Sequence, residues 1–179
     1  MRLPDYEYNN KTVTEPELLE IGKYIKDHDV KMMLEFGSGI SSHYFGTLCE
    51  VLSLEDQPLW LLTTRNLAGI HGPSNYKVIP WGGREDLPDE ARQKWDLIFI
   101  DGPVGTAYGE YGRSGAFQAA RYLVDMGCPA VWMHDAWEHH CIDQAVRHLA
   151  PVCRLAAYPK WDAPNKYFRS ASMLLWEKI

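Results

Sequence analysis

The segment Met32–Ser42, with the sequence MMLEFGSGISS, decides the fold of this chain. Its short apolar run carries an acid near the end, Glu35. Two glycines in Gly-x-Gly spacing follow, Gly37 and Gly39, and then a Ser-Ser pair that begins at Ser41. This order predicts a strand, a tight turn and a helix N-terminus, where unpaired N–H groups favour electron-rich ligand atoms. A tight connection without a ligand is the alternative interpretation.

Composition narrows the class of protein. With 179 residues, of which 46% are hydrophobic and 23% charged, the chain is expected to form one domain over residues 1–179. No apolar run approaches the ~20 residues of a membrane span, and the first residues lack the apolar region of a secretory signal. The four cysteines have no Cys-x-x-Cys spacing, which favours free thiols in a reducing compartment. We therefore expect a cytoplasmic protein.

The charge pattern and the aromatic residues limit the partners. The net charge of −6 is spread along the chain without a stripe of Lys and Arg, so we expect no nucleic-acid partner. Several of the 7 Trp and 10 Tyr fall in expected loops, where a flat ring could stack on a sugar or an adenine, or simply pack. Partners should be small or neutral molecules. The sequence leaves the oligomeric state open, with a homodimer as one option.

Strands and helices alternate along most of the chain. Apolar runs bounded by acids or turn residues are typical of strands buried on both faces of a parallel sheet. The last two expected strands have no helix between them, so they should be antiparallel. We expect a doubly wound α/β sheet of seven strands with an antiparallel last strand. The expected helices cover residues 15–27, 41–49, 58–67, 88–93, 115–126 and 138–149, and the expected strands cover 31–36, 51–55, 76–80, 96–101, 130–134, 153–158 and 171–179.

Four of these strands end in an acid or in a His-Asp pair. The groups are Glu35, Glu55, Asp101 and His134-Asp135. Doubly wound sheets bind ligands at the carboxyl ends of their strands, and a charge placed there is costly without a partner. The recurrence of these groups is the strongest functional signal in the sequence.

Together these residues resemble the class I S-adenosylmethionine (SAM)-dependent methyltransferases, from about Leu18 to Ile179. LEFGSGISS resembles the first motif of that family, acid-x-Gly-x-Gly, and DLIFIDGP resembles the fourth. Ser42 stands where a nicotinamide-binding Rossmann domain would have its third glycine. The phrases SLEDQPLW, FIDGP followed by Gly112-Arg113, and MHDAW are similar to small O-methyltransferases of sugars and polysaccharides, including the plant glucuronoxylan methyltransferases. The resemblance implies a Rossmann-like fold with SAM as cofactor.

The resemblance also implies which residues bind the cofactor. The first motif would hold the methionine end of SAM. Glu55 would accept hydrogen bonds from the ribose hydroxyls, since one carboxylate can accept from both, and Asp56 is the alternative. Trp81 or a nearby backbone amide would meet the adenine. The implied cofactor-binding residues are Glu35, Gly37, Gly39, Ser41, Glu55, Trp81 and Asp101.

The catalytic candidates are Asp135, His134, Asp101 and Arg113. Asp135 would be the general base or would set one up, with His134 and Asp101 as partners at neighbouring strand ends. Asp101 and Asp135 could instead hold a divalent cation that lowers the pKa of an acceptor hydroxyl, although the sequence does not require one. The structural alternative is that Asp135 caps the next helix. Catechol-type methyltransferases have an Asp-Asn pair where this chain has His134-Asp135, which argues against their magnesium chemistry.

The acceptor would be covered by variable segments. The loop 102–114 is expected to act as a lid, with Tyr108, Tyr111 and Arg113 supplying stacking and anion-binding groups. Arg113 could instead pair with the helix that follows, and residues 1–13 would form an N-terminal arm. We predict a SAM-dependent O-methyltransferase that acts on a hydroxyl, with a sugar in a glycan or glycan precursor as the expected acceptor. Methylation of a small phenol or amine, and a non-catalytic SAM-binding module, are the alternatives.

Overall fold

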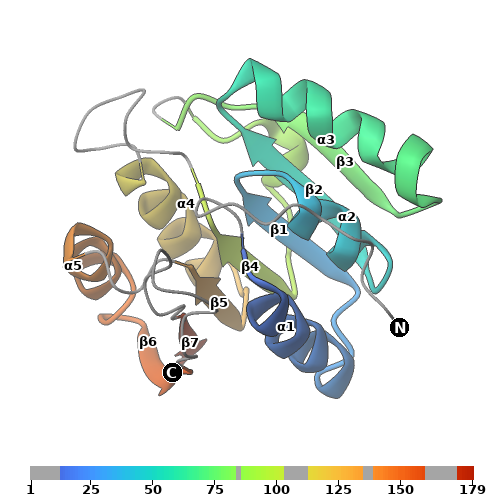
Figure 1. Cartoon of the computed structure of the whole chain (residues 1–179). Helices are drawn as coiled ribbons and strands as arrows, with labels where there is room; N and C mark the ends of the chain where they lie inside the picture. Colours follow the sequence, from blue (N-terminus) through green and yellow to red (C-terminus); the bar gives the residue numbers. More distant parts are fainter. Residues whose placement is uncertain (1–12, 84–85, 103–112, 135–138, 160–172) are drawn as a thin grey trace.

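A computed structural model describes residues 13–83, 86–102, 113–134, 139–159 and 173–179 (Figure 1). They form one seven-stranded sheet with helices on both faces. The helices are α1 (Glu15–Asp27), α2 (Ile40–Gly46), α3 (Pro58–His71), α4 (Ser114–Asp125) and α5 (His139–His148), with a 3-10 turn η1 (Asp89–Ala91). The strands are β1 (Met32–Phe36), β2 (Glu50–Glu55), β3 (Tyr76–Pro80), β4 (Leu97–Ile100), β5 (Ala130–Met133), β6 (Cys153–Ala157) and β7 (Leu174–Lys178).

The sheet has the strand order β3-β2-β1-β4-β5-β7-β6. Strands β1 to β5 are parallel to one another, and β7 lies antiparallel between β5 and β6. The predicted doubly wound sheet with an antiparallel last strand is therefore confirmed. The chain leaves the sheet edge at β3 and returns to β4 beside β1, so the strand order reverses between β1 and β4. The carboxyl ends of strands at such a reversal are where sheets of this kind bind ligands.

Two apolar clusters cover the two faces of the sheet. One includes Leu34 and Phe36 of β1 together with residues of α4 and α5. The other includes Met33 of β1 together with residues of α1 and α2. Successive strand residues point to opposite faces, so a strand covered on both sides must be apolar at every position. This explains why each of the 4 residues of β4 is fully buried.

Helix α3 is longer than the sequence predicts. The prediction ended this helix at residue 67, near Gly69, but it continues to His71 and stops at Gly72, whose φ is +96°. A Cβ added at Gly69 would meet no described atom within 4 Å, so this glycine is an ordinary exposed helix position. Gly72 has a positive φ that glycine adopts at little steric cost, and its N–H makes the last helical hydrogen bond, to the carbonyl of Ala68. Two glycines, Gly69 and Gly72, lie near the end of this helix, and the prediction ended it at the wrong one.

Other element boundaries also differ. The helix expected over 41–49 ends at Gly46, because the hydroxyl and the N–H of Thr47 both donate to the carbonyl of Tyr44 and tighten the last turn. The segment expected to be helical over 88–93 forms only the 3-10 turn η1. The last strand was expected from residue 171 and begins, within the described residues, at Leu174.

All four cysteines are free, as the sequence predicts. Cys49 is half-buried, and the other three, Cys128, Cys141 and Cys153, are buried. No helix in the described parts of the chain is both long enough and apolar enough to cross a bilayer.

Candidate functional site

The carboxyl ends of β1, β2 and β4 surround a cavity that we call the turn cavity. Of the residues predicted to bind the cofactor or to act in catalysis, Gly37, Gly39, Ser41, Glu55 and Asp101 line it. The complete lining consists of Val13, Gly37, Ser38, Gly39, Ile40, Ser41, Glu55, Asp56, Trp60, Asp101 and Gly102. Residues from three separate strand ends therefore meet at one place, beside the reversal of strand order.

Two glycines hold the ends of β1 and β4 close together. Gly37 has a φ of +100°, and its N–H donates to the carbonyl of Leu54 at 2.8 Å. A Cβ added at Gly37 would lie 3.0 Å from the backbone nitrogen of Gly102, and one added at Gly102 would lie 2.9 Å from Cα of Gly37. The first glycine of the motif is thus required by the protein itself, because both its torsion and this backbone contact exclude a side chain.

Gly39 is required by neither torsion nor packing. Its φ of 160° is extended backbone that alanine can adopt, and a Cβ there would meet no described atom within 4 Å. The added methyl group would instead project into open space on the wall of the turn cavity. A ligand that approaches the main chain closely is the remaining reason for glycine at this position.

Gly39→Ala should therefore weaken ligand binding without unfolding the protein. We expect the affinity for S-adenosylhomocysteine (SAH) to fall about tenfold or more, because the new methyl group occupies ligand space. The free energy of unfolding should change by less than about 0.5 kcal/mol. Calorimetry and thermal unfolding measure the two effects, with Gly69→Ala in α3 as the control for an added methyl group in open space. Unchanged SAH affinity in Gly39→Ala would mean that no ligand lies against this turn.

Glu35 lies beneath the turn and is fully buried. Its carboxylate accepts hydrogen bonds from the hydroxyls of Ser41 and Ser42, at 2.5 Å each, and from Ser53 at 2.6 Å. Burial raises the pKa of Glu35 to about 7, although the three hydroxyls act in the opposite direction. Glu35 is not part of the turn-cavity lining. Its observed contacts fix the first turn of α2 under the motif, and direct contact with a cofactor stays a prediction.

The raised pKa of Glu35 predicts a pH dependence of stability. Between its ordinary pKa of 4.5 and about 7, the folded protein binds a proton that the unfolded chain does not. Stability from this group therefore increases as pH falls from 7 to 4.5, by an amount on the order of 3 kcal/mol. In Glu35→Gln this contribution should disappear. Denaturant unfolding of both proteins between pH 5 and pH 8 tests this, and parallel stability curves would contradict it.

Glu55, at the end of β2, is buried but reaches the wall of the turn cavity. Its carboxylate accepts hydrogen bonds from the Ser38 hydroxyl at 2.8 Å and from the backbone N–H of Gln57 at 2.9 Å. Burial is the main cause that raises the pKa of Glu55 to about 7. Asp56, the alternative ribose ligand, lines the same cavity. Both candidate ribose ligands, Glu55 and Asp56, therefore line the turn cavity, and the assignment of the ribose to one of them stays a prediction.

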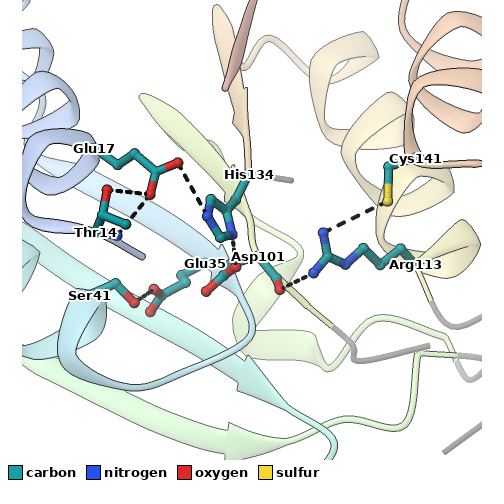
Figure 2. Close-up of polar contacts among 8 residues, drawn as sticks. All are labelled: Thr14, Glu17, Glu35, Ser41, Asp101, Arg113, His134 and Cys141. Atoms are coloured by element: carbon teal, nitrogen blue, oxygen red, sulfur yellow. Dashed lines mark hydrogen bonds and ion pairs between the residues drawn. The ribbon is translucent and has the colours of Figure 1, made fainter. Parts of the chain in front are cut away.

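Asp101 and His134 meet at the ends of β4 and β5 (Figure 2). Nδ1 of His134 lies 2.6 Å from Oδ1 of Asp101. On the other side of the ring, Nε2 lies 3.3 Å from Oε1 of Glu17, a fully buried residue of α1. The imidazole is thus held between two carboxylates. Sequence reasoning found Asp101 and His134 but missed Glu17. Thr14 and Glu17 have the spacing of a helix capping box, which by itself explains an acid at that position.

Arg113 is directed toward the end of β4 rather than into the turn cavity. Its Nη2 donates to the backbone carbonyl of Asp101 at 2.9 Å, and its Nη1 lies 3.8 Å from Sγ of Cys141 on α5 (Figure 2). These contacts connect the start of α4 with β4 and α5. Neither contact is to α4, the helix that the structural alternative names, and a contact of Arg113 with an acceptor stays a prediction.

Trp81 lies outside the turn cavity. Its ring packs on Phe36 with centroids 5.2 Å apart, and its backbone N–H donates to the carbonyl of Glu55 at 2.9 Å. It lines a larger cavity of about 600 Å³ between α4 and the connection from β3 to β4. The lining of this larger cavity contains no predicted catalytic residue. We place the candidate site at the smaller turn cavity because the strand-end acids and the glycine turn are there.

Some predicted residues lie outside the described parts of the chain. These are Asp135, most of the predicted lid with Tyr108 and Tyr111, and most of the N-terminal arm. Within residues 13–83, 86–102, 113–134, 139–159 and 173–179, no group of three or more His, Cys, Asp or Glu is arranged to hold a metal ion. The proposed cation ligands Asp101 and Asp135 therefore stay a prediction.

No protein-family model matches the chain, and no curated protein sequence matches it. Solved structures do match. The precorrin-6y C5,15-methyltransferase from Geobacter metallireducens GS-15 has a TM-score of 0.66 at 18% identity, over 97% of this chain and 94% of that one. The O-methyltransferase from Bacillus cereus, in complex with SAH, has a TM-score of 0.65 at 12% identity, over 98% and 84%. The O-methyltransferase TomG from Streptomyces achromogenes, in complex with SAM, has a TM-score of 0.64 at 11% identity, over 93% and 82%.

These similarities span almost the whole chain and agree with the observed strand order. At 11% to 18% identity they show a common fold and do not show a common activity. The chain has the Rossmann-like, seven-stranded fold of the class I SAM-dependent methyltransferases.

Proposed function

We propose that this protein is a SAM-dependent O-methyltransferase. The observation that carries the proposal is the convergence of Glu55, Asp101 and the turn 37–39 on one cavity at the carboxyl ends of β1, β2 and β4. The sequence resemblance assigns cofactor binding to these same residues. Proteins of the same fold have been solved with SAM or SAH bound.

The residues of the turn cavity suit this cofactor chemically. The Glu55 carboxylate can accept hydrogen bonds from the hydroxyls of a ribose, and the open space beside Gly39 allows a close approach to the main chain. When bound, SAM supplies a methyl group on a positively charged sulfur. Asp101, an acid on the same cavity wall, would favour that positive charge.

The chain must also remove a proton from the acceptor. In methyl transfer to oxygen, an O–C bond forms, the C–S bond of the cofactor breaks, and the hydroxyl proton goes to a base. Asp101 lines the turn cavity and is hydrogen-bonded to His134. The pair can therefore take that proton and hold it in a fixed position. Asp135, which follows His134 in the sequence, is the alternative base.

We propose a sugar hydroxyl, in a glycan or glycan precursor, as the acceptor. The support is the similarity of the sequence phrases to sugar and polysaccharide O-methyltransferases, together with one indole ring at the turn cavity. Trp60 lines this cavity, and an indole face can stack on a sugar ring. A small phenol or amine is the second candidate, because the same face stacks on aromatic rings.

Release of SAH in the presence of acceptor panels tests this function. The protein should convert SAM to SAH when it is given one of two kinds of acceptor, simple methyl glycosides or oligosaccharides that contain uronic acids. Release only with catechols or with amines would replace the sugar by the second candidate. Cofactor binding without release for any panel would identify a non-catalytic binding module. Loss of activity with EDTA and recovery with magnesium would show that a cation is needed.

A further inference from the structure

Glu17 is a buried carboxylate with two different sets of contacts. Its Oε2 accepts hydrogen bonds from the backbone N–H and the hydroxyl of Thr14, at 2.8 Å each, which closes the capping box of α1. Its Oε1 accepts no well-aligned hydrogen bond from the described residues and faces Nε2 of His134 at 3.3 Å. A capping box needs only the first set. The complete burial of the second oxygen against an imidazole needs another explanation.

The three side chains lie in order from the protein interior to the turn cavity. The side chain of Glu17 is 0% exposed, that of His134 is 10% exposed, and that of Asp101 is 18% exposed. Only Asp101 is part of the cavity lining. Glu17 can therefore act on a bound acceptor only through His134 and Asp101 (Figure 2).

The contacts on both sides of the imidazole fix its orientation. With Nδ1 toward Asp101 and Nε2 toward Glu17, each ring nitrogen faces a carboxylate oxygen. A half-turn of the ring would place carbon atoms at both oxygens and leave a buried carboxylate without its partner, which costs about 1–3 kcal/mol or more. Glu17 therefore opposes the half-turn and keeps Nδ1 on Asp101, in the manner of the outer partner that orients a catalytic histidine.

We propose that Glu17 is a positioning residue that holds His134, and through it the Asp101 carboxylate, in the arrangement that receives the acceptor proton. This inference rests on the proposed function for the role of Asp101. The contacts that define it run from α1 through the end of β5 to the end of β4 and involve only side chains of this chain.

The test is the nitrogen spectrum of the histidines in the whole protein, labelled with 15N and measured at neutral pH without ligand. His134→Asn assigns the His134 signals by their loss. In the wild type, the Nδ1 of His134 should carry a proton, because it donates to Asp101. In Glu17→Gln, the Nε2 resonance of His134 should shift or broaden, because an amide replaces the carboxyl group that Nε2 faces.

Two controls separate positioning from helix capping. Glu15→Gln makes the same charge change in the first turn of α1 at an exposed position. Thr14→Ala removes only the hydroxyl that donates to Oε2 of Glu17, while the carboxylate and its hydrogen bond from the backbone N–H remain. Both should leave the His134 signals in place, because the Glu17 oxygen that faces Nε2 remains in each variant. Equal shifts in Thr14→Ala and Glu17→Gln, or no shift in Glu17→Gln, would overturn the inference. If Glu17→Gln does not fold, a bare Nδ1 in the wild-type spectrum would overturn it as well.

The outcome can be separated from that of the proposed function. SAH affinity of Glu17→Gln should remain within about twofold of the wild type, because Glu17 does not line the turn cavity. If SAH does not bind the wild type, the proposed function fails whatever the spectra show. If SAH binds and the His134 signals are unchanged in Glu17→Gln, only the role of Glu17 fails.

Discussion

Asp101→Asn should lower the turnover number kcat by about 10²–10⁴-fold, the usual contribution of a general base. The asparagine keeps the shape of the side chain and can still accept a hydrogen bond from Nδ1 of His134, but it cannot take a proton from an acceptor. SAH formation with an acceptor that the wild type methylates measures the effect. Affinity for SAH should change less than kcat.

Asp96→Asn is the matched control for this substitution. Asp96 lies just before β4, at its opposite end, where its carboxylate accepts hydrogen bonds from the backbone N–H groups of Lys31 and Met32 at 2.9 and 3.0 Å. Its replacement should affect stability and leave kcat unchanged. Near-normal kcat in folded Asp101→Asn would show that the base is elsewhere, with Asp135 as the next candidate.

Glu55→Gln should weaken SAH binding by about 1–3 kcal/mol, because the ribose hydroxyls lose a charged acceptor. The raised pKa of Glu55, about 7, adds a pH dependence. In the wild type the carboxylate becomes protonated as pH falls below 7, so SAH affinity should decrease toward pH 5. In Glu55→Gln the affinity should be low and independent of pH over this range.

Glu50→Gln, at the exposed start of the same strand, is the control for Glu55→Gln. It should bind SAH as the wild type does, at every pH. Calorimetric titrations between pH 5 and pH 8 compare the three proteins. Unchanged affinity in Glu55→Gln would assign the ribose to Asp56 or move it away from β2.

The fold could be predicted because its central strands are buried on both faces. Such strands are continuous apolar runs, as in LIFI of β4, and the acids that follow them mark where each run ends. The element ends were harder, because they depend on contacts made only in the folded chain. Gly69 and Gly72 both suit a helix end, and only the backbone conformation at Gly72 distinguishes them.

The site was predictable only in part, for a related reason. Parallel strand ends meet at one edge of the sheet, so the strand-end positions of Glu55, Asp101 and His134 indicated that they would lie near one another. Nothing in the sequence placed Glu17 against His134, because this contact joins α1 to the end of β5, two elements far apart in the sequence. Glu35 shows that a strand-end acid need not face the ligand site. Its carboxylate accepts hydrogen bonds from three serine hydroxyls beneath the turn.

The central claim is that a nucleoside cofactor binds at the turn between β1 and α2, and calorimetry with SAH tests it most directly. The wild type should bind one SAH per chain with a Kd in the micromolar range, and both Gly39→Ala and Glu55→Gln should bind it more weakly while remaining folded. Absence of binding to the folded wild type at high micromolar SAH would contradict the account.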